Sequence, residues 1–127
     1  MKLIFVYNAN SGFVNTLLDI GHKALDPETY QCNLCNLTHG ITGEHKEWKK
    51  FRQESAVEMR FLHRDEFERE YQKKFDYPVI LKENEVLDVF ISQTELDKIN
   101  RLDNLIQKVN SLLEDNNVSV KSEKNVS

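Results

Sequence analysis

The 127-residue chain has few of the residues that mark specialised classes of protein. It contains two cysteines, two prolines and four glycines, so it is neither a disulfide-rich secreted scaffold nor a low-complexity chain. No apolar run approaches the roughly 18 residues needed to cross a bilayer. The net charge of -4 lacks the basic excess needed to bind nucleic acid or an anionic membrane. These absences predict a soluble protein, and the length predicts one domain.

The N-terminus also lacks the pattern of a secretion signal. The segment MKLIFVYNANSG has one lysine and about five apolar residues before it turns polar, and no cleavage site of small residues follows. We therefore predict a cytoplasmic protein, in which thiols are mostly reduced. A permanent structural disulfide is then the least expected role for the two cysteines, Cys32 and Cys35.

The spacing of apolar residues predicts alternating strands and helices. Lys2–Tyr7 is a nearly continuous apolar run, as in a strand covered on both faces, and a helix follows at about 13–25. The further predicted elements are a helix at Glu44–Glu54 with Trp48 and Phe51 inward, a strand at Val57–Leu62, a charged helix carrying Phe67, Tyr71 and Phe75, a hairpin of Val79–Lys82 and Val86–Ile91, and a helix with an apolar stripe from Leu96 to Leu113. Residues 114–127 are polar without periodicity and are predicted to be a disordered tail.

This order of elements predicts an α/β fold. A strand–helix–strand unit is parallel, and a tight hairpin is antiparallel, so together they make a four-stranded mixed sheet with helices on both faces. The single domain spans 1–113, with a helical insertion at about 26–56 that follows the first helix. If Val109–Leu113 overhangs the sheet, the last helix is a contact for a homodimer.

One segment of the chain has a counterpart in a known family. The stretch YPVILKENEVLDVFI, Tyr77–Ile91, followed by a capped helix, resembles the second half of a thioredoxin. In the thioredoxin-like superfamily a cis-proline precedes the third core strand, so the resemblance implies that the bond before Pro78 is cis. The likeness covers Lys2–Leu25 and Val57–Leu113. A thioredoxin carries its CxxC pair directly after the first strand, whereas this chain has NANSG there and its cysteines follow the first helix.

The C-x-x-C pair in TYQCNLCNLTHG is the strongest candidate for chemistry. Such a pair is a redox signature when it begins a helix beside a βαβ unit. The nucleophile is expected to be the more exposed cysteine, Cys32, and Cys35 would resolve the mixed disulfide formed with a protein thiol or a small molecule. His39 lies four residues beyond Cys35, so if a helix runs through these two residues, the imidazole faces Cys35 and favours its thiolate.

Two other roles for these cysteines stay open. Cysteine is often buried, so both side chains can simply pack inward. Alternatively Cys32, Cys35 and His39 have acceptable spacing for zinc, with His22 or His45 as the fourth ligand, although the chain has no second close pair of ligands. Either role would make the protein a non-enzymatic binding module, whereas the redox hypothesis requires no cofactor.

The segment YNANSG is a second candidate site. A strand that ends in small polar residues before a helix presents free N–H groups to an anion, although the same residues also serve as helix caps. Asn8, Asn10 and Ser11 would lie beside the loop that holds Tyr77 and Pro78. The chain has no G-x-x-x-x-G-K-[ST] loop and no lysine beside NANSG, so no nucleotide-binding motif supports a GTPase activity.

Overall fold

The computed structural model describes residues 1–9, 32–40 and 43–116. The helix predicted at about 13–25 lies outside these ranges, as do Asn10, Ser11, His22 and the polar residues from 117 onwards. Among the described residues, the helices are all too short or too polar to cross a membrane.

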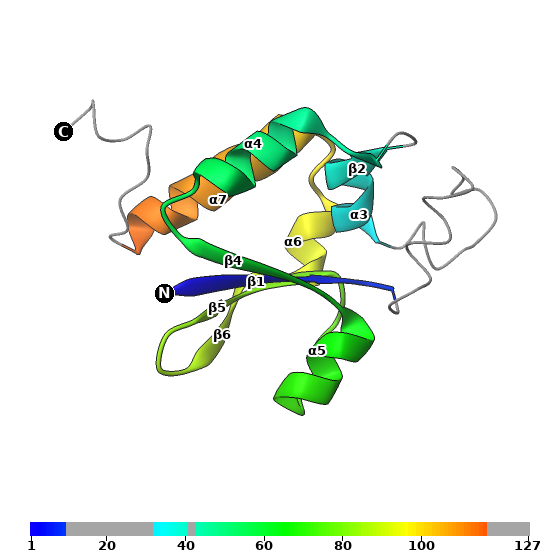
Figure 1. The fold of residues 1–127 in the computed structure, drawn as a ribbon, viewed down its shortest axis with the longest axis vertical. Helices are drawn as coiled ribbons and strands as arrows, with labels where there is room; N and C mark the ends of the chain where they lie inside the picture. Colours follow the sequence, from blue (N-terminus) through cyan, green and yellow to red (C-terminus); the bar gives the residue numbers. More distant parts are fainter. Residues whose placement is uncertain (10–31, 41–42, 117–127) are drawn as a thin grey trace.

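Four strands form one mixed sheet (Figure 1). They are β1 (Lys2–Tyr7), β4 (Glu58–His63), β5 (Val79–Glu83) and β6 (Leu87–Ile91). Their order is β4-β1-β5-β6, with β1 parallel to β4 and antiparallel to β5, and with β5 antiparallel to β6. The predicted mixed sheet is therefore confirmed. Because β5 alone runs in the opposite direction, its amino end shares one edge with the carboxyl ends of the other three strands.

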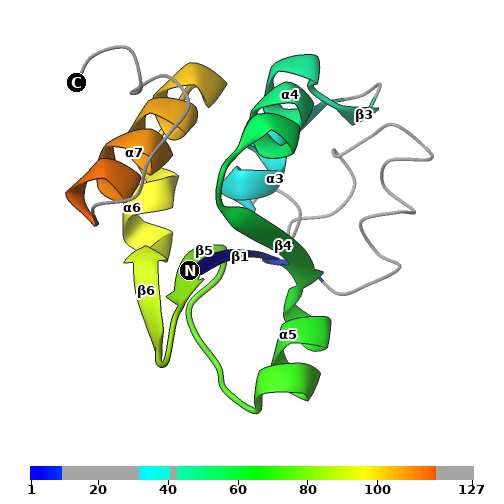
Figure 2. The same cartoon turned by 60° about the vertical axis from the view of Figure 1, so that its left-hand side comes forward.

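Helices cover both faces of this sheet (Figures 1 and 2). The helix α5 (Arg64–Tyr71) lies on one face. The other face carries α3 (Asn33–Thr38), α4 (Lys46–Glu54), α6 (Gln93–Asp97) and α7 (Leu102–Asp115). Between α3 and α4, the short strands β2 (His39–Gly40) and β3 (Gly43–Glu44) pair with each other. The part of the predicted insertion that the structure describes thus contains two helices and this pair of strands.

Side chains of β1 pack alternately into two apolar clusters. Leu3 and Phe5 pack with residues of α3, α4, α6 and α7, and Ile4 and Val6 pack with α5. All four are fully buried, which is what a continuous apolar run predicts for a strand covered on both faces. Trp48 of α4 is also fully buried, with its ring 5.5 Å from that of Phe5, so it fixes α4 to the sheet as predicted.

The apolar stripe at 96–113, which predicted one helix, is divided between α6 and α7. At the break, the side-chain amide of Asn33 donates hydrogen bonds to the carbonyl oxygens of Leu96 and Ile99, at 2.6 and 2.8 Å. Helix C-termini leave carbonyl groups without intrahelical partners, and Asn33 supplies partners here. The break between α6 and α7 is therefore accompanied by hydrogen bonds from Asn33, a residue far away in the sequence.

The helix α7 packs into the core of its own chain. Leu105, Val109 and Leu113 are fully buried, so the described structure has no apolar overhang at Val109–Leu113. The condition set for a homodimer contact, an overhang at these positions, is therefore not met, and a homodimer through the last helix stays a prediction. The helix also includes Glu114 and Asp115, which extends it into the predicted polar tail.

Candidate functional site

The cysteine pair lies at the start of a helix. Cys32 and Cys35 form a disulfide, with their Cα atoms 5.3 Å apart. The structure thus contains the oxidised pair, whereas mostly reduced thiols are expected in a cytoplasmic chain. Cys32 is the N-cap of α3, and Cys35 lies in the first turn. This is the local arrangement in which a C-x-x-C pair is typical of redox proteins.

The disulfide also lies at the end of the first strand. The backbone N–H of Asn8, which directly follows β1, donates a hydrogen bond to Cys32 Sγ at 3.3 Å, and the N–H of Cys35 donates a second one at the same distance. In the sequence, the pair follows the helix predicted at about 13–25 and not the first strand. The fold instead brings Cys32 back to a residue 24 positions earlier. Such donors favour the charged form of a sulfur.

The proline shares this edge of the sheet. The peptide bond before Pro78 is cis, as the resemblance implied. Pro78 directly precedes β5, and because Val6 pairs with Val79, Pro78 lies next to the end of β1. The contact between Asn8 and Cys32 lies at that same end. The topology therefore gathers the disulfide, the polar end of β1 and the cis-proline, which come from three separate segments.

The two sulfurs differ in their access to solvent. Cys32 is fully buried, while Cys35 is only partly buried. The expectation that Cys32 is the more exposed cysteine is therefore wrong. Cys32 is covered because it begins α3 against the end of β1 and belongs to the apolar core, whereas Cys35 only packs against that core. An incoming thiol would reach Cys35 first.

His39 lies outside the cysteine helix. The helix α3 ends at Thr38, and the backbone N–H of His39 caps the carbonyl of Cys35. The imidazole Nδ1 lies 2.7 Å from Thr38 Oγ1, and the ring packs edge-on against Tyr7. Because Thr38 donates its one proton to the carbonyl of Leu34, Nδ1 is assigned as the protonated nitrogen of His39. Burial lowers the pKa of His39.

Tyr77 connects the loop before Pro78 to α5. Its hydroxyl donates a hydrogen bond to Glu68 Oε2 at 2.7 Å and accepts one from the backbone N–H of Phe75. Burial, followed by the hydrogen bond to Glu68, raises the pKa of Tyr77 to about 12. The phenol is therefore neutral at physiological pH and fixes the position of this loop.

Two residues that the sequence analysis did not single out hold this edge together. Arg64 donates through Nη1 to Asn8 Oδ1 at 2.9 Å and through its backbone N–H to the carbonyl of Ala9 at 3.1 Å. Arg64 directly follows β4, which is parallel to β1, so the predicted topology already placed it near the residues that follow β1. Asn33, which links α3 to α6, has no comparable sequence signal beyond its position next to Cys32.

The alternative zinc set is not assembled in the described chain. The sulfur atoms of Cys32 and Cys35 are bonded to each other, His22 lies outside the described ranges, and His45 is the N-cap of α4. Within residues 1–9, 32–40 and 43–116, no three His, Cys, Asp or Glu side chains are arranged to hold a metal ion. A zinc site would need the disulfide to open and further ligands to approach.

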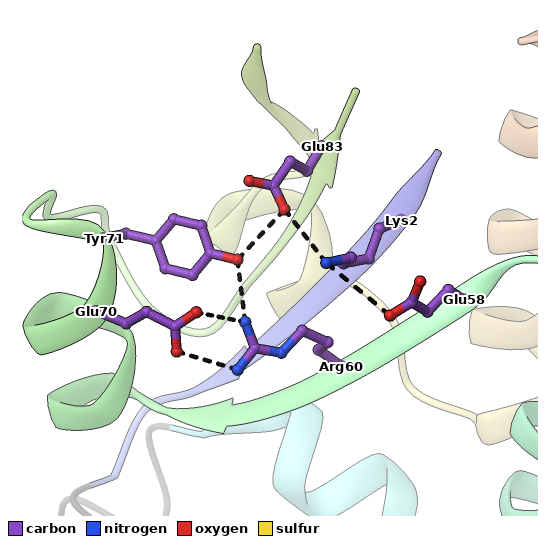
Figure 3. A network of polar contacts seen from close by, with 6 residues as sticks. All are labelled: Lys2, Glu58, Arg60, Glu70, Tyr71 and Glu83. Carbon is purple, nitrogen blue, oxygen red and sulfur yellow. Dashed lines mark hydrogen bonds and ion pairs between the residues drawn. The ribbon is translucent and has the colours of Figure 1, made fainter. Parts of the chain in front are cut away.

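A second group of polar side chains lies towards the opposite edge of the sheet (Figure 3). Its members are Lys2, Glu58, Arg60, Glu70, Tyr71 and Glu83. Arg60 makes paired hydrogen bonds to Glu70 at 2.6 and 3.0 Å, and the Tyr71 hydroxyl lies between Arg60 and Glu83. These mutual bonds connect α5 to β4 and β5. We interpret the group as structural because its charged side chains pair with one another.

The comparisons with known proteins add no relative. The chain matches no protein-family model, no curated protein and no solved structure. It is a mixed α/β protein whose described part carries a disulfide at the edge of the sheet where β1 ends.

Proposed function

We propose that this chain is a thioredoxin-like thiol–disulfide oxidoreductase and that Cys32 and Cys35 are its redox centre. The observation that carries the proposal is the position of the disulfide, which begins α3 at the end of β1, the end of the sheet at which the cis-proline Pro78 also enters. The strand order β4-β1-β5-β6, which combines a parallel pair with an antiparallel hairpin, supports the thioredoxin-like assignment.

The unequal access of the two sulfurs suggests the course of the exchange. An external thiolate attacks Cys35 Sγ, a bond forms between these two sulfurs, and the Cys32–Cys35 bond breaks. The electron pair leaves on Cys32, whose thiolate accepts the N–H groups of Asn8 and Cys35. A second external thiolate attacks the external sulfur of the mixed disulfide and releases Cys35. Two external thiols are thereby oxidised to a disulfide; one of their protons ends on Cys35 and the other is released to solvent, so Cys32 stays a thiolate.

The predicted cytoplasmic location is part of this proposal. Disulfides in reducing compartments are usually transient and catalytic, so an exchangeable pair suits that environment better than a permanent one. The partner would be a protein thiol or a small thiol of the glutathione type.

Equilibration with glutathione tests the activity. The protein is incubated in mixtures of reduced and oxidised glutathione, and its free thiols are counted after quenching. We expect two thiols to appear together and reversibly, because donors that stabilise a thiolate make its disulfide easier to reduce. Structural disulfides, with potentials below about -300 mV, resist the glutathione pool. A disulfide that survives excess reduced glutathione would contradict the proposal.

Single-cysteine variants test the roles of the two sulfurs. Cys32→Ser keeps the partly buried thiol and should form a mixed disulfide with oxidised glutathione. Cys35→Ser keeps the fully buried thiol and should react at least about tenfold more slowly, because exchange depends on access. Equal rates would contradict the assignment of Cys35 as the attacked sulfur. One zinc per chain in the reduced wild-type protein would favour a binding module instead.

A further inference from the structure

The segment that donates to the buried sulfur is itself held from the start of α5. Asn8 and Ala9 follow β1, and Arg64 binds both of them, through its guanidinium to Asn8 Oδ1 and through its backbone N–H to the Ala9 carbonyl. The last paired residues of β1 and β4 are Tyr7 and His63, so this contact directly extends the parallel ladder. The guanidinium bond spans 56 positions of the sequence.

We propose that Arg64 is a positioning residue for the redox centre, because it holds Asn8 so that the Asn8 N–H points at Cys32 Sγ. The inference depends on the proposed function for its biological meaning. Its effect on the sulfur passes through Asn8, to which both hydrogen bonds are made. The outcome it controls is how readily the disulfide is reduced.

The direction of the effect follows from the two states of the sulfur. In the disulfide, Cys32 Sγ is a weak, neutral acceptor, whereas in the reduced protein its thiolate accepts charge-assisted hydrogen bonds, which are roughly twice as strong. A donor that is correctly placed therefore stabilises the reduced form more than the oxidised form. Loss of the hydrogen bond from Arg64 to Asn8 should therefore shift the equilibrium towards the disulfide.

A direct effect of the Arg64 charge on the sulfur is a different mechanism. The charge of Arg64 also acts on the neighbouring phenol of Tyr77, so its field reaches the loop before Pro78. Asn8→Ala separates the two mechanisms, because it removes the carboxamide that Arg64 holds and leaves the charge in place. If Arg64 acts by position, Asn8→Ala reproduces the effect of losing the arginine.

The experiment measures the equilibrium of each full-length variant with reduced and oxidised dithiothreitol. Arg64→Met keeps the straight side-chain stem and removes the donors. It should raise the equilibrium constant for disulfide formation about three- to tenfold. A tenfold change lowers the potential by about 30 mV. Arg64→Lys, which keeps a donor, should stay within about twofold of the wild type. The control Arg69→Gln removes a positive charge from the same helix at a side chain that is 72% exposed, and should change nothing.

Non-additivity is the sharpest outcome. We expect Asn8→Ala to match Arg64→Met, and the double variant to be no more oxidised than either single one. An unchanged constant in Asn8→Ala, additive effects in the double variant, or an equal shift in Arg69→Gln would overturn the inference. If Arg64→Met does not fold, as judged by circular dichroism, Asn8→Ala decides alone.

Failure of the proposed function gives a different result. Dithiothreitol equilibrates with disulfides that glutathione cannot reduce, so the ratio between variant and wild type is measurable in both cases. A wild-type disulfide that resists glutathione but responds to Arg64→Met refutes the oxidoreductase and keeps the positioning role. If glutathione reduces the wild-type disulfide but Arg64→Met leaves its equilibrium constant unchanged, the oxidoreductase proposal stands and the positioning role is refuted.

Discussion

Asn33 allows a quantitative test of how the cysteine helix is held in the fold. Its side-chain amide donates to the carbonyl oxygens of Leu96 and Ile99 at 2.6 and 2.8 Å, and these are the contacts that join α3 to the end of α6. Each such hydrogen bond contributes a net stability of about 1 kcal/mol. Asn33→Ala should therefore lower the free energy of unfolding by about 2 kcal/mol.

The substitution Asn33→Asp sharpens this test. It keeps the shape of the side chain and replaces the donating amide with a carboxylate that faces the same two carbonyl oxygens. At this partly buried site a carboxylate facing two carbonyl oxygens adds repulsion to the loss of both donors, so Asn33→Asp should be less stable than Asn33→Ala. The control is Asn36→Ala on the same helix, where the side chain is exposed and the expected change lies within about 0.5 kcal/mol.

Urea unfolding of the oxidised protein is the appropriate assay, because the disulfide stays constant across the series. With a slope of about 2 kcal/mol per molar, the loss of 2 kcal/mol moves the midpoint by about 1 M. The reasoning would be refuted if Asn33→Ala unfolded at the same urea concentration as Asn36→Ala. An Asn33→Asp protein more stable than the alanine variant would refute the donor geometry.

Two other predictions concern pH and the network of Figure 3. Burial lowers the pKa of His39 below 6.5, so on acidification the unfolded chain binds a proton before the folded chain does. The free energy of unfolding should therefore fall as the pH drops below 6.5. His39→Gln should flatten this fall, which unfolding curves at pH 5 and 7 can measure. An unchanged slope would exclude His39 as its cause. Tyr71→Phe removes the hydroxyl between Arg60 and Glu83 and should lower the free energy of unfolding by about 1 kcal/mol, which thermal unfolding can measure. A variant as stable as the wild type would show that the hydroxyl adds nothing to stability.

Local patterns in the sequence were sufficient for most of the elements. The apolar run of β1 predicted a strand buried on both faces, and the capped helix predicted after Ile91 is α6, which begins with a capping box of Ser92 and Glu95. Both signals are local, because periodicity and caps depend on residues a few positions apart. The break between α6 and α7 was not predicted because Asn33, about 60 residues away, supplies the hydrogen bonds there.

The site was predictable in its components and not in its geometry. The resemblance implied the cis bond before Pro78, and the C-x-x-C spacing identified the sulfurs. The sequence could not indicate which sulfur is buried, because burial of Cys32 depends on where α3 meets β1. It also could not indicate that Arg64 reaches Asn8, since an arginine in a charged helix has many other partners within reach.

The common edge of the sheet explains why segments so distant in sequence meet at one place. Strands β1 and β4 are parallel, so the residues after them, Asn8 and Arg64, leave the sheet on the same side. The strand β5 is antiparallel to β1, so the residue before it, Pro78, enters at that side too. Once these directions are set, a cysteine that returns to the end of β1 lies close to all three. The direction of β5 thus brings Pro78 to the end of the sheet where Cys32 meets Asn8, although the two residues are far apart in the sequence.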